Sequence, residues 1–245
     1  FIPLNASIFY GNESLGVDFD ATDETGFGYY SVNDTRFSIN QSGFLTNSTS
    51  LSGGNYLLNI SINDTSNNIN WLIYNVNVLK SNEDCSVYFN TSSPITYPET
   101  FRVYTNCSSS YNLFMNGTQI LNNSIIDSGA GYYNFTSERQ ENENYTYIFH
   151  QREFIVLKNP EICGIFFNET SPINYPATFR VWANCTSPFT LYRNSTEILN
   201  NSEQKLVTGT YNFSMFRLDS QNFSYTYNYS YFTIDELLDV TPPYF

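Results

Sequence analysis

Charged side chains are scarce in this chain of 245 residues, and basic ones are the scarcer kind. Charged residues make up 13% of it, against about 25% in an average soluble domain. Ten Lys and Arg face 23 Asp and Glu, giving a net charge of -13, and no run of five basic residues occurs. Nucleic acids and anionic membranes are held by basic clusters, so this composition argues against both as partners. We interpret the acidity as a solvated surface rather than a dedicated cation site.

Long apolar runs and a secretory leader are also missing. The longest apolar stretch, Trp71 to Leu79, contains Asn75 and Asn77 and is far shorter than the ~20 residues that a bilayer-spanning helix needs. No leader of the secretory type begins at Phe1. We therefore expect a mature or excised segment that does not insert into a membrane.

Histidine occurs once and cysteine only four times. His150 lies in a strand-like sequence without a Cys-x-x-Cys or Gly-x-Ser-x-Gly motif nearby, so we interpret it as a strand histidine, with a catalytic triad as the alternative. Cys85 and Cys107, like Cys163 and Cys185, are 22 residues apart. We expect the disulfides Cys85–Cys107 and Cys163–Cys185, as in an oxidising compartment. The alternative is four free buried thiols.

The chain is rich in Asn-x-Ser/Thr triplets, the acceptor sequence for N-linked sugar. There are twenty, none with Pro in the middle, and this density is far above what chance supplies. We predict a sugar-coated extracellular or cell-surface protein. The candidate glycosylation sites are Asn5, Asn12, Asn33, Asn40, Asn47, Asn59, Asn63, Asn90, Asn106, Asn116, Asn122, Asn134, Asn144, Asn168, Asn184, Asn194, Asn200, Asn212, Asn222 and Asn228.

The middle residue of a triplet is often aromatic or β-branched. In a strand, residues i and i+2 share one face and i+1 points to the other, so such a triplet would present its Asn and bury its middle residue. The middle residues in question are Ile60, Phe135, Tyr145, Phe213, Phe223 and Tyr229. In the last strand, Asn222 to Ile234, alternation also groups Tyr225, Tyr227 and Tyr231 with the last two. We expect most of these rings in the core, with exposed, sugar-stacking tyrosines as the alternative.

Sliding the chain by 78 residues reveals a tandem repeat. Cys85–Val103 matches Cys163–Val181, and six acceptor triplets recur in register. Asn116-Gly117 and Asn194-Ser195 sit between apolar runs, which favours hairpin turns. We predict two immunoglobulin-like β-sandwich copies, residues 81–158 and 159–236, because short strands alternate with turn signals and no helical period appears.

Residues 1–80 lack cysteine and follow another order of motifs. An Ala21-x-Asp23 turn precedes a Tyr30-Ser-Val strand, a Phe37-to-Leu45 hairpin, a Tyr56-x-Leu-x-Ile strand and a Val-rich final strand. This order resembles the cadherin-like repeat, in the Asn/Thr-rich form found in long archaeal and bacterial surface proteins. The resemblance implies a cadherin-like β-sandwich, and hence an all-β chain of tandem immunoglobulin-like and cadherin-like domains.

That resemblance also raises the question of calcium, which such families hold at domain junctions with Asp-x-Asn-Asp linkers. Ser81–Asp84 and Asp235–Asp239 only loosely match such a linker. Asp20, Asp23 and Asp64 are weak candidates for Ca²⁺, together with Asp18, Glu24 and Asp34. The alternative is a set of turn aspartates that bond their own backbone. We expect no other cofactor.

Asp239–Phe245 resembles the linker that opens the next domain in those surface proteins. We therefore assign residues 237–245 to a linker or to the first strand of a next domain or subunit. Self-association would be head to tail by strand addition, with the first domain incomplete alone. The predicted function is a structural, non-enzymatic filament or surface-rod subunit. The alternatives are an adhesin and a glycoside hydrolase, which needs two carboxylates about 5–9.5 Å apart.

Overall fold

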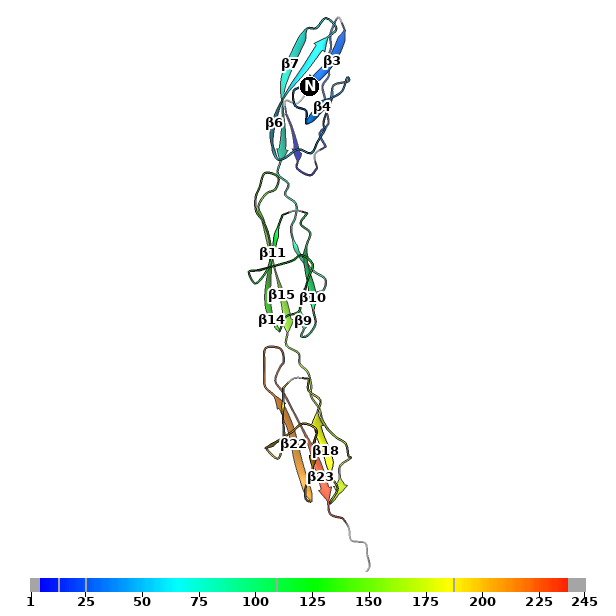
Figure 1. The fold of residues 1–245 in the computed structure, drawn as a ribbon, viewed down its shortest axis with the longest axis vertical. Coiled ribbons are helices and arrows are strands. Elements are labelled where there is room, and N and C mark those ends of the chain that lie inside the picture. The colour runs from blue at the N-terminus through cyan, green and yellow to red at the C-terminus, as the bar shows by residue number, and fades with distance from the viewer. Residues whose placement is uncertain (1–4, 13, 25, 109, 187, 238–245) are drawn as a thin grey trace, which may run out of the picture. The chain divides into compact units, whose positions relative to one another are not determined.

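A computed structural model describes residues 5–12, 14–24, 26–108, 110–186 and 188–237 (Figure 1). Every helix or strand assigned within these ranges is a β-strand, which confirms the all-β prediction. No described segment forms a helix of the kind that crosses a bilayer. The residues on which the predicted chain-end linker and the head-to-tail junction depend, 1–4 and 238–245, lie outside the described ranges.

The first sandwich consists of strands β1 to β7. Their bounds are β1 (Asn5–Phe9), β2 (Val17–Asp18), β3 (Phe27–Val32), β4 (Phe37–Ile39), β5 (Phe44–Asn47), β6 (Gly54–Asp64) and β7 (Ile69–Leu79). One sheet has the order β1-β7-β6-β3 and the other β2-β5-β4. Leu45 from the smaller sheet and Leu58, Tyr74 and Val76 from the larger are fully buried in one shared core. All strand segments predicted between 30 and 78 are present.

Strand β1 is paired within this chain. It runs parallel to β7, with Asn5 opposite Asn75 and Phe9 opposite Leu79. The head-to-tail hypothesis holds that a strand from another subunit completes the first domain. In this structure, β1 of the same chain already pairs with β7 at this edge of the sheet.

The second and third sandwiches have the same sequence of strands. The second has β8 (Val87–Phe89), β9 (Ile95–Thr96), β10 (Phe101–Thr105), β11 (Asn112–Met115), β12 (Thr118–Ile120), β13 (Ser124–Ile126), β14 (Gly131–Arg139) and β15 (Ile148–Leu157). The third has β16 (Ile165–Phe167), β17 (Ile173–Asn174), β18 (Phe179–Ala183), β19 (Thr190–Arg193), β20 (Thr196–Ile198), β21 (Ser202–Gln204), β22 (Gly209–Arg217) and β23 (Thr226–Asp235). Their sheets run β13-β10-β8 with β12-β11-β14-β15-β9, and β16-β18-β21 with β17-β23-β22-β19-β20.

By compactness the chain divides into two units rather than three. The first unit holds the described residues up to Tyr88 with Val103–Ser124 and Asn134–Arg152, and the second holds Phe89–Arg102, Ile125–Tyr133 and the described residues from Glu153 on. Each sheet nevertheless takes its strands from one sandwich only, β1 to β7, β8 to β15 or β16 to β23. The domain boundaries at 80 and 158 stay a prediction.

Stacked rings occupy the same core position in both copies. Phe101 stacks on Phe154 with ring centroids 3.7 Å apart, and Phe179 stacks on Phe232 at 3.9 Å. All four side chains are fully buried. Because each pair joins the two sheets of its sandwich, these rings supply a large share of the apolar burial in a copy of about 78 residues.

The two predicted hairpin turns are present. Asn116 and Gly117 join β11 to β12 with φ of 48° and 79°, and Asn194 and Ser195 join β19 to β20 with φ of 46° and 68°. Two consecutive positive φ values define the two-residue turn whose twist suits a hairpin. Ser195 adopts this conformation although its Cβ atom makes positive φ sterically unfavourable, a cost that glycine does not have.

A tyrosine tether recurs in all three sandwiches. The hydroxyl of Tyr56 donates to the carbonyl of Ser52 at 2.8 Å, Tyr133 donates to Gly129 at 2.6 Å, and Tyr211 donates to Val207 at 3.0 Å. Each tyrosine lies near the start of β6, β14 or β22 and reaches four residues back. Immunoglobulin-type sandwiches carry such a tyrosine corner at the start of a central strand.

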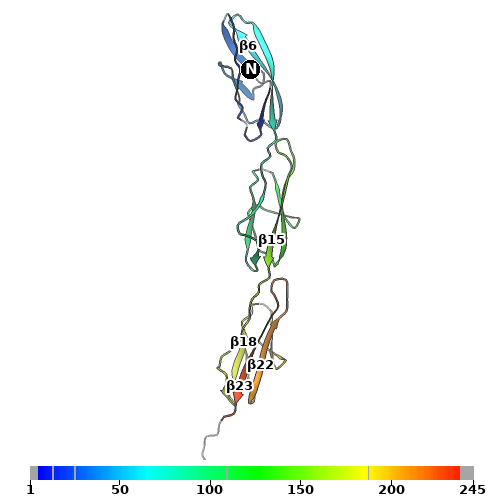
Figure 2. The ribbon, with the colours of Figure 1, turned by 180° about the vertical axis from the view of Figure 1, so that it is seen from behind.

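The prediction for the last strand is wrong about which side faces the core. Phe232 and Ile234 of β23 are buried, whereas Tyr225, Tyr227, Tyr229 and Tyr231 are exposed. Side chains alternate along a strand, so only one set can face the core. The interior takes Phe232 and Ile234, which have no hydroxyl to satisfy, and the tyrosines take the outer face of the strand. Figure 2 shows β23 beside β22, its neighbour in the sheet.

Candidate glycosylation surface

A recurring hydrogen-bond ring fixes many acceptor asparagines, and Asn90 illustrates it. The backbone N–H of Asn90 donates to the carbonyl of Arg102 at 3.2 Å. The backbone N–H of Arg102 donates in return to Asn90 Oδ1 at 2.6 Å. We call this arrangement an asparagine clamp: the backbone N–H of one asparagine donates to the carbonyl of a partner residue, and its Oδ1 accepts the N–H of the same partner. It uses Oδ1 of the side chain and leaves the amide nitrogen Nδ2 out of the ring.

Seven acceptor asparagines form such a clamp, and all seven are exposed. The clamped pairs are Asn33–Asn59, Asn40–Phe44, Asn90–Arg102, Asn116–Asn134, Asn168–Arg180, Asn184–Gly164 and Asn194–Asn212. Nδ2 of Asn168 lies 3.4 Å from Glu169 Oε1. No hydrogen bond from Nδ2 is found for the other six within the described part of the chain.

One clamp occurs in all three sandwiches and joins two acceptor asparagines. The Oδ1 atoms of Asn33, Asn116 and Asn194 accept the N–H groups of Asn59, Asn134 and Asn212 at 2.8, 2.8 and 2.9 Å. The 78-residue repeat relates the last two pairs, but nothing in the sequence aligns the first pair with them. Acceptor triplets thus lie side by side on equivalent strands of each sandwich.

Five further acceptors use Oδ1 in a similar way, but their backbone N–H does not bond the same partner. Asn47, Asn122, Asn144, Asn200 and Asn222 accept backbone N–H groups of Leu15, Thr105, Gly53, Ala183 and Ala130, at 2.9 to 3.2 Å. Nδ2 of Asn47 donates to Thr49 at 3.1 Å. Nδ2 of Asn122 and of Asn200 each lies 3.4 Å from the carbonyl of its own partner.

Two candidate acceptors are poorly placed for modification. Asn63 is only 7% exposed, and its Oδ1 is buried without a hydrogen-bond partner among the described residues. Asn228 lies on the inner side of β23, where its Nδ2 donates to the carbonyl of Cys163 at 2.9 Å. The same alternation that turns Tyr229 outward turns Asn228 inward.

The remaining acceptors are accessible. Asn5, Asn12 and Asn106 are exposed. Asn59, Asn134 and Asn212 are half-buried on central strands, each with an Oδ1 that has no partner. Their middle residues Ile60, Phe135 and Phe213 are buried, as predicted, whereas Tyr145 and Phe223 are half-buried because they precede the strands.

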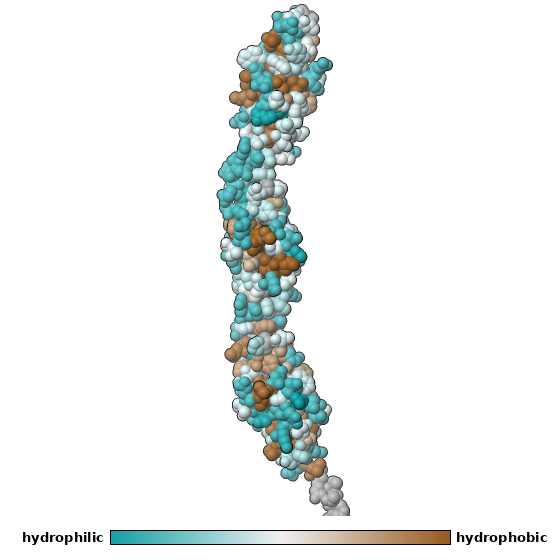
Figure 3. Space-filling model, in the orientation of Figure 1, coloured by the Kyte–Doolittle hydropathy of each residue, from teal (hydrophilic) through white to brown (hydrophobic). Residues whose placement is uncertain are grey.

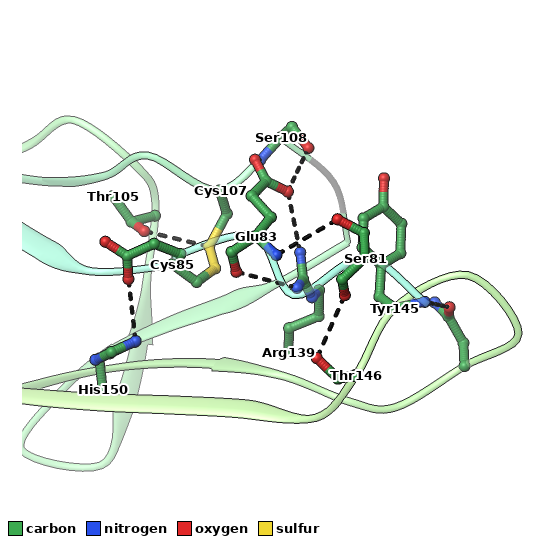
Figure 4. A network of polar contacts seen from close by, with 12 residues as sticks. Ser81, Glu83, Cys85, Thr105, Cys107, Ser108, Arg139, Tyr145, Thr146 and His150 are labelled. Carbon is green, nitrogen blue, oxygen red and sulfur yellow. Dashed lines mark hydrogen bonds and ion pairs between the residues drawn. A yellow bond between two sulfur atoms is a disulfide. The ribbon is translucent and has the colours of Figure 1, made fainter. Parts of the chain in front are cut away.

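Both predicted disulfides are present, each beside a buried arginine. Cys85 is joined to Cys107 and Cys163 to Cys185, with Cα atoms 4.6 and 5.1 Å apart. Figure 4 shows the first of them next to the contacts of Arg139 and Glu83. Ser137 Oγ donates to the carbonyl of Cys85, which anchors this end of the bridge to β14.

The Arg139 guanidinium is completely buried and holds Glu83 (Figure 4). Its NH1 lies 3.1 Å from Glu83 Oε2, and its carbon is 4.3 Å from the ring centre of Tyr145. Ser108 donates both its N–H and its hydroxyl to the same carboxylate. A buried charge is tolerated only when paired and hydrogen-bonded, and here both partners are.

The second copy repeats this pair as Arg217 and Glu161, 2.5 Å apart, with Phe223 in the place of Tyr145. Burial alone would raise the pKa of Glu161. Hydrogen bonds from Thr186 and Arg217 outweigh it, so the pKa lies below its usual range. Neither pair was predicted from the sequence, although Glu83 and Arg139 have identical counterparts 78 residues on.

His150 lies on β15, as predicted, and contacts an aspartate. Its Nε2 is 3.2 Å from Asp84 Oδ1, and the hydroxyl of Ser86 donates to the same oxygen at 2.7 Å. The carboxylate therefore lies between hydroxyl and imidazole. A catalytic triad needs the imidazole in that middle position to take the hydroxyl proton, so these three residues do not form one.

Three of the six candidate calcium ligands, Asp20, Asp23 and Asp64, line one cavity of about 420 Å³ in the first sandwich, beside Tyr30 and Trp71. Asp23 accepts the N–H of Gly26, and Asp64 accepts N–H groups of Ser66 and Asn68. The side-chain amide of Asn68 also lowers the pKa of Asp64. No group of three acidic, His or Cys residues with metal-site geometry occurs in the described ranges. These contacts are those of turn aspartates bonding their own backbone.

Comparison with known proteins gave structural likeness alone. No family model and no curated protein matches the sequence. The human desmocollin-1 ectodomain is 11% identical, with a TM-score of 0.34, over 99% of this chain and 62% of its own. Cadherin domains 3–6 of protocadherin gamma B2 are 10% identical at 0.32, over 95% and 71%. Immunoglobulin domains 1–4 of sidekick-1 are 9% identical at 0.27, over 96% and 74%.

Proposed function

We propose that this chain is a structural, non-enzymatic subunit of an extracellular or cell-surface assembly, whose exterior is built to carry N-linked glycans. Three features of the chain support the proposal. They are the all-β sandwich framework, the two disulfides, which suit an oxidising compartment, and the clamps that hold acceptor asparagines on the surface.

One observation carries the proposal. A clamp uses only atoms of the asparagine and of its partner, so it places no demand on the residue two positions further on. Of the eight asparagines that form a clamp within the described residues, seven nevertheless have Ser or Thr there, and Asn142, clamped to Tyr145, has Asn144. Among these seven hydroxyls, within the described residues, only that of Ser42 donates to the asparagine of its own triplet. We attribute the Ser or Thr at these positions to sugar transfer, and of the seven hydroxyls that of Thr186 also serves the fold by donating to Glu161.

The clamp is also compatible with the modified side chain. Transfer joins Nδ2 to the anomeric carbon of an activated sugar, displaces the phosphate leaving group of that donor and releases an amide proton. Oδ1 remains a carbonyl acceptor. The clamp therefore persists after modification and holds the sugar outward.

The surface colouring agrees with this picture. The face in Figure 3 is mostly hydrophilic or neutral, and its hydrophobic patches are separated from one another. With few charged residues to keep the chain in solution, we assign that role to the glycans.

Site-resolved glycopeptide mass spectrometry of the secreted chain tests the proposal. We expect sugar on the clamped asparagines and none on Asn63 or Asn228. Bare asparagines at most of the clamped positions would contradict it. Head-to-tail association is the assembly we propose for this subunit, and sedimentation of the glycosylated chain over a range of concentrations tests that part separately.

The second candidate is an adhesin. The exposed tyrosines of the last strand favour it, because tyrosine rings supply both apolar area and a hydroxyl for sugar recognition. Retention of the enzymatically deglycosylated chain on a glycan array would support the adhesin over the structural subunit.

A further inference from the structure

Four exposed tyrosines follow one another along the end of the third sandwich. Tyr225, Tyr227, Tyr229 and Tyr231, which we call the tyrosine stripe, are 58%, 52%, 56% and 59% exposed. The ring centroids of Tyr227 and Tyr229 are 6.1 Å apart, and those of Tyr229 and Tyr231 are 5.8 Å apart. From Tyr227 to Tyr231 the stripe is therefore a continuous aromatic surface, not a set of scattered rings.

An acceptor triplet lies on the same side of the sheet. The register of β22 and β23 places Asn212 opposite Tyr231 and Ser214 opposite Tyr229. Residues directly opposite each other share a face, with Cβ atoms about 4.5–5.5 Å apart. The asparagine and the hydroxyl of the Asn212-Phe213-Ser214 triplet therefore both adjoin the stripe, while Phe213 between them is buried in the core.

The third strand of this face completes the surroundings of Asn212. Tyr192 of β19 lies opposite Ser214 and stacks on Phe216 at 5.5 Å. Asn194 clamps the backbone of Asn212 from the same side of the strand. On the face that carries Asn212, its neighbours from β19 and β23 are thus uncharged, which suits a neutral sugar better than a charged peptide.

We propose that the first sugars of an N-glycan on Asn212 pack against the rings of Tyr231 and Tyr229. The inference rests on the proposed function, because it needs Asn212 to be modified. A sugar ring has an apolar C–H face that complements the face of an aromatic ring, while the tyrosine hydroxyl stays available to sugar hydroxyls. The covalent link holds the two together at high effective concentration, so even a weak contact is populated.

The second sandwich supplies a natural comparison. Asn134 is the counterpart of Asn212 in the 78-residue repeat, but the counterparts of Tyr231 and Tyr229 are Glu153 and Gln151, both exposed. A glycan on Asn134 therefore has a similar attachment point without the aromatic surface.

The test compares release of the two glycans from the full, folded chain after secretion from cells that perform N-glycosylation. An amidase that hydrolyses the bond between asparagine and sugar is added under native conditions, and glycopeptide mass spectrometry follows each site. If the contact between sugar and ring has the free energy of an ordinary aromatic pair, release of the glycan from Asn212 is roughly two- to tenfold slower than release from Asn134.

Three variants make the test specific. Tyr229→Ser/Tyr231→Ser should bring release at Asn212 to the rate at Asn134, and the matched control Tyr225→Ser/Tyr227→Ser, at the other end of the stripe, should not. The reverse graft Gln151→Tyr/Glu153→Tyr should slow release at Asn134. The graft keeps the test informative if the serine variant folds poorly.

The outcomes separate the inference from the proposed function. Equal release rates at occupied Asn212 and Asn134, or no change in both the serine variant and the graft, overturn the inference and leave the proposed function intact. A bare Asn212 beside occupied clamped asparagines does the same. Bare asparagines throughout overturn the proposed function first.

Discussion

Asn90 and Arg102 exchange two hydrogen bonds, one from backbone to backbone and one from backbone to the asparagine side chain. The side chain of Asn90 thus replaces a second strand residue at a place where the ladder would otherwise leave an N–H without a partner. Seven acceptor asparagines share this structural role of Oδ1, and the proposed function adds a chemical role for Nδ2. Substitutions can separate the two roles.

We expect Asn90→Ala to lower the free energy of unfolding of the unglycosylated chain by about 1 kcal/mol, because the N–H of Arg102 loses its acceptor. Asn90→Asp keeps an oxygen in place and should cost much less. Asn106→Ala is the control, since Asn106 is an exposed acceptor with no clamp. Denaturant unfolding measures all three, and an equal loss for the Ala and Asp variants at position 90 would contradict the clamp.

The hairpin turn at Asn194-Ser195 offers a stabilising substitution. Ser195→Gly should raise the free energy of unfolding by about 0.5–1 kcal/mol, because Ser195 holds φ at 68° with a Cβ atom. The triplet stays intact, as Asn116-Gly117-Thr118 shows in the other copy. The reciprocal Gly117→Ser should destabilise by a similar amount. A Ser195→Gly variant less stable than the parent would count against the turn.

Acid should weaken the third sandwich through Glu161. Its pKa is lowered in the folded state, so its contribution is present above the unfolded pKa of about 4.3 and is lost as pH falls through the folded value. Glu161→Gln should flatten the fall in unfolding free energy on going from pH 5 to pH 3. Glu197→Gln, a change at an exposed glutamate, should leave the fall as it is. A steeper fall in the Glu161 variant would refute the assignment.

Loss of a disulfide should affect one sandwich at a time. The double variant Cys85→Ser/Cys107→Ser should lose about 3 kcal/mol of unfolding free energy, as expected for a closed loop of 22 residues. The first sandwich has no cysteine. Reductant should therefore leave the hydrogen-exchange protection of β6 and β7 unchanged, while protection falls in the second and third sandwiches. A loss of protection in β6 would show that the sandwiches do not unfold separately.

The sequence predicted most of the framework. Asn116-Gly117 predicted its hairpin because positive φ at both positions demands such residues, and equal cysteine spacing in two copies predicted both bridges. Phe135 and Phe213 were placed correctly, because each is the one large apolar residue between two polar ones.

Two features could not be predicted for physical reasons. In β23 the tyrosines on one face compete for the interior with Phe232 and Ile234 on the other, and alternation alone does not say whether Tyr229 or Phe232 is buried. The clamp between Asn33 and Asn59 joins residues 26 positions apart, so its existence depends on strand register, which a single sequence does not define. The burial of Asn63 has the same origin.

The tyrosine stripe has a practical consequence for material produced without sugars. Exposed aromatic rings along one strand favour self-association. The net charge of -13 opposes self-association by repulsion between molecules, but only where salt does not screen that charge. Such material should therefore stay dispersed in dilute buffer and aggregate as salt is added, whereas the sugar-bearing chain should tolerate both.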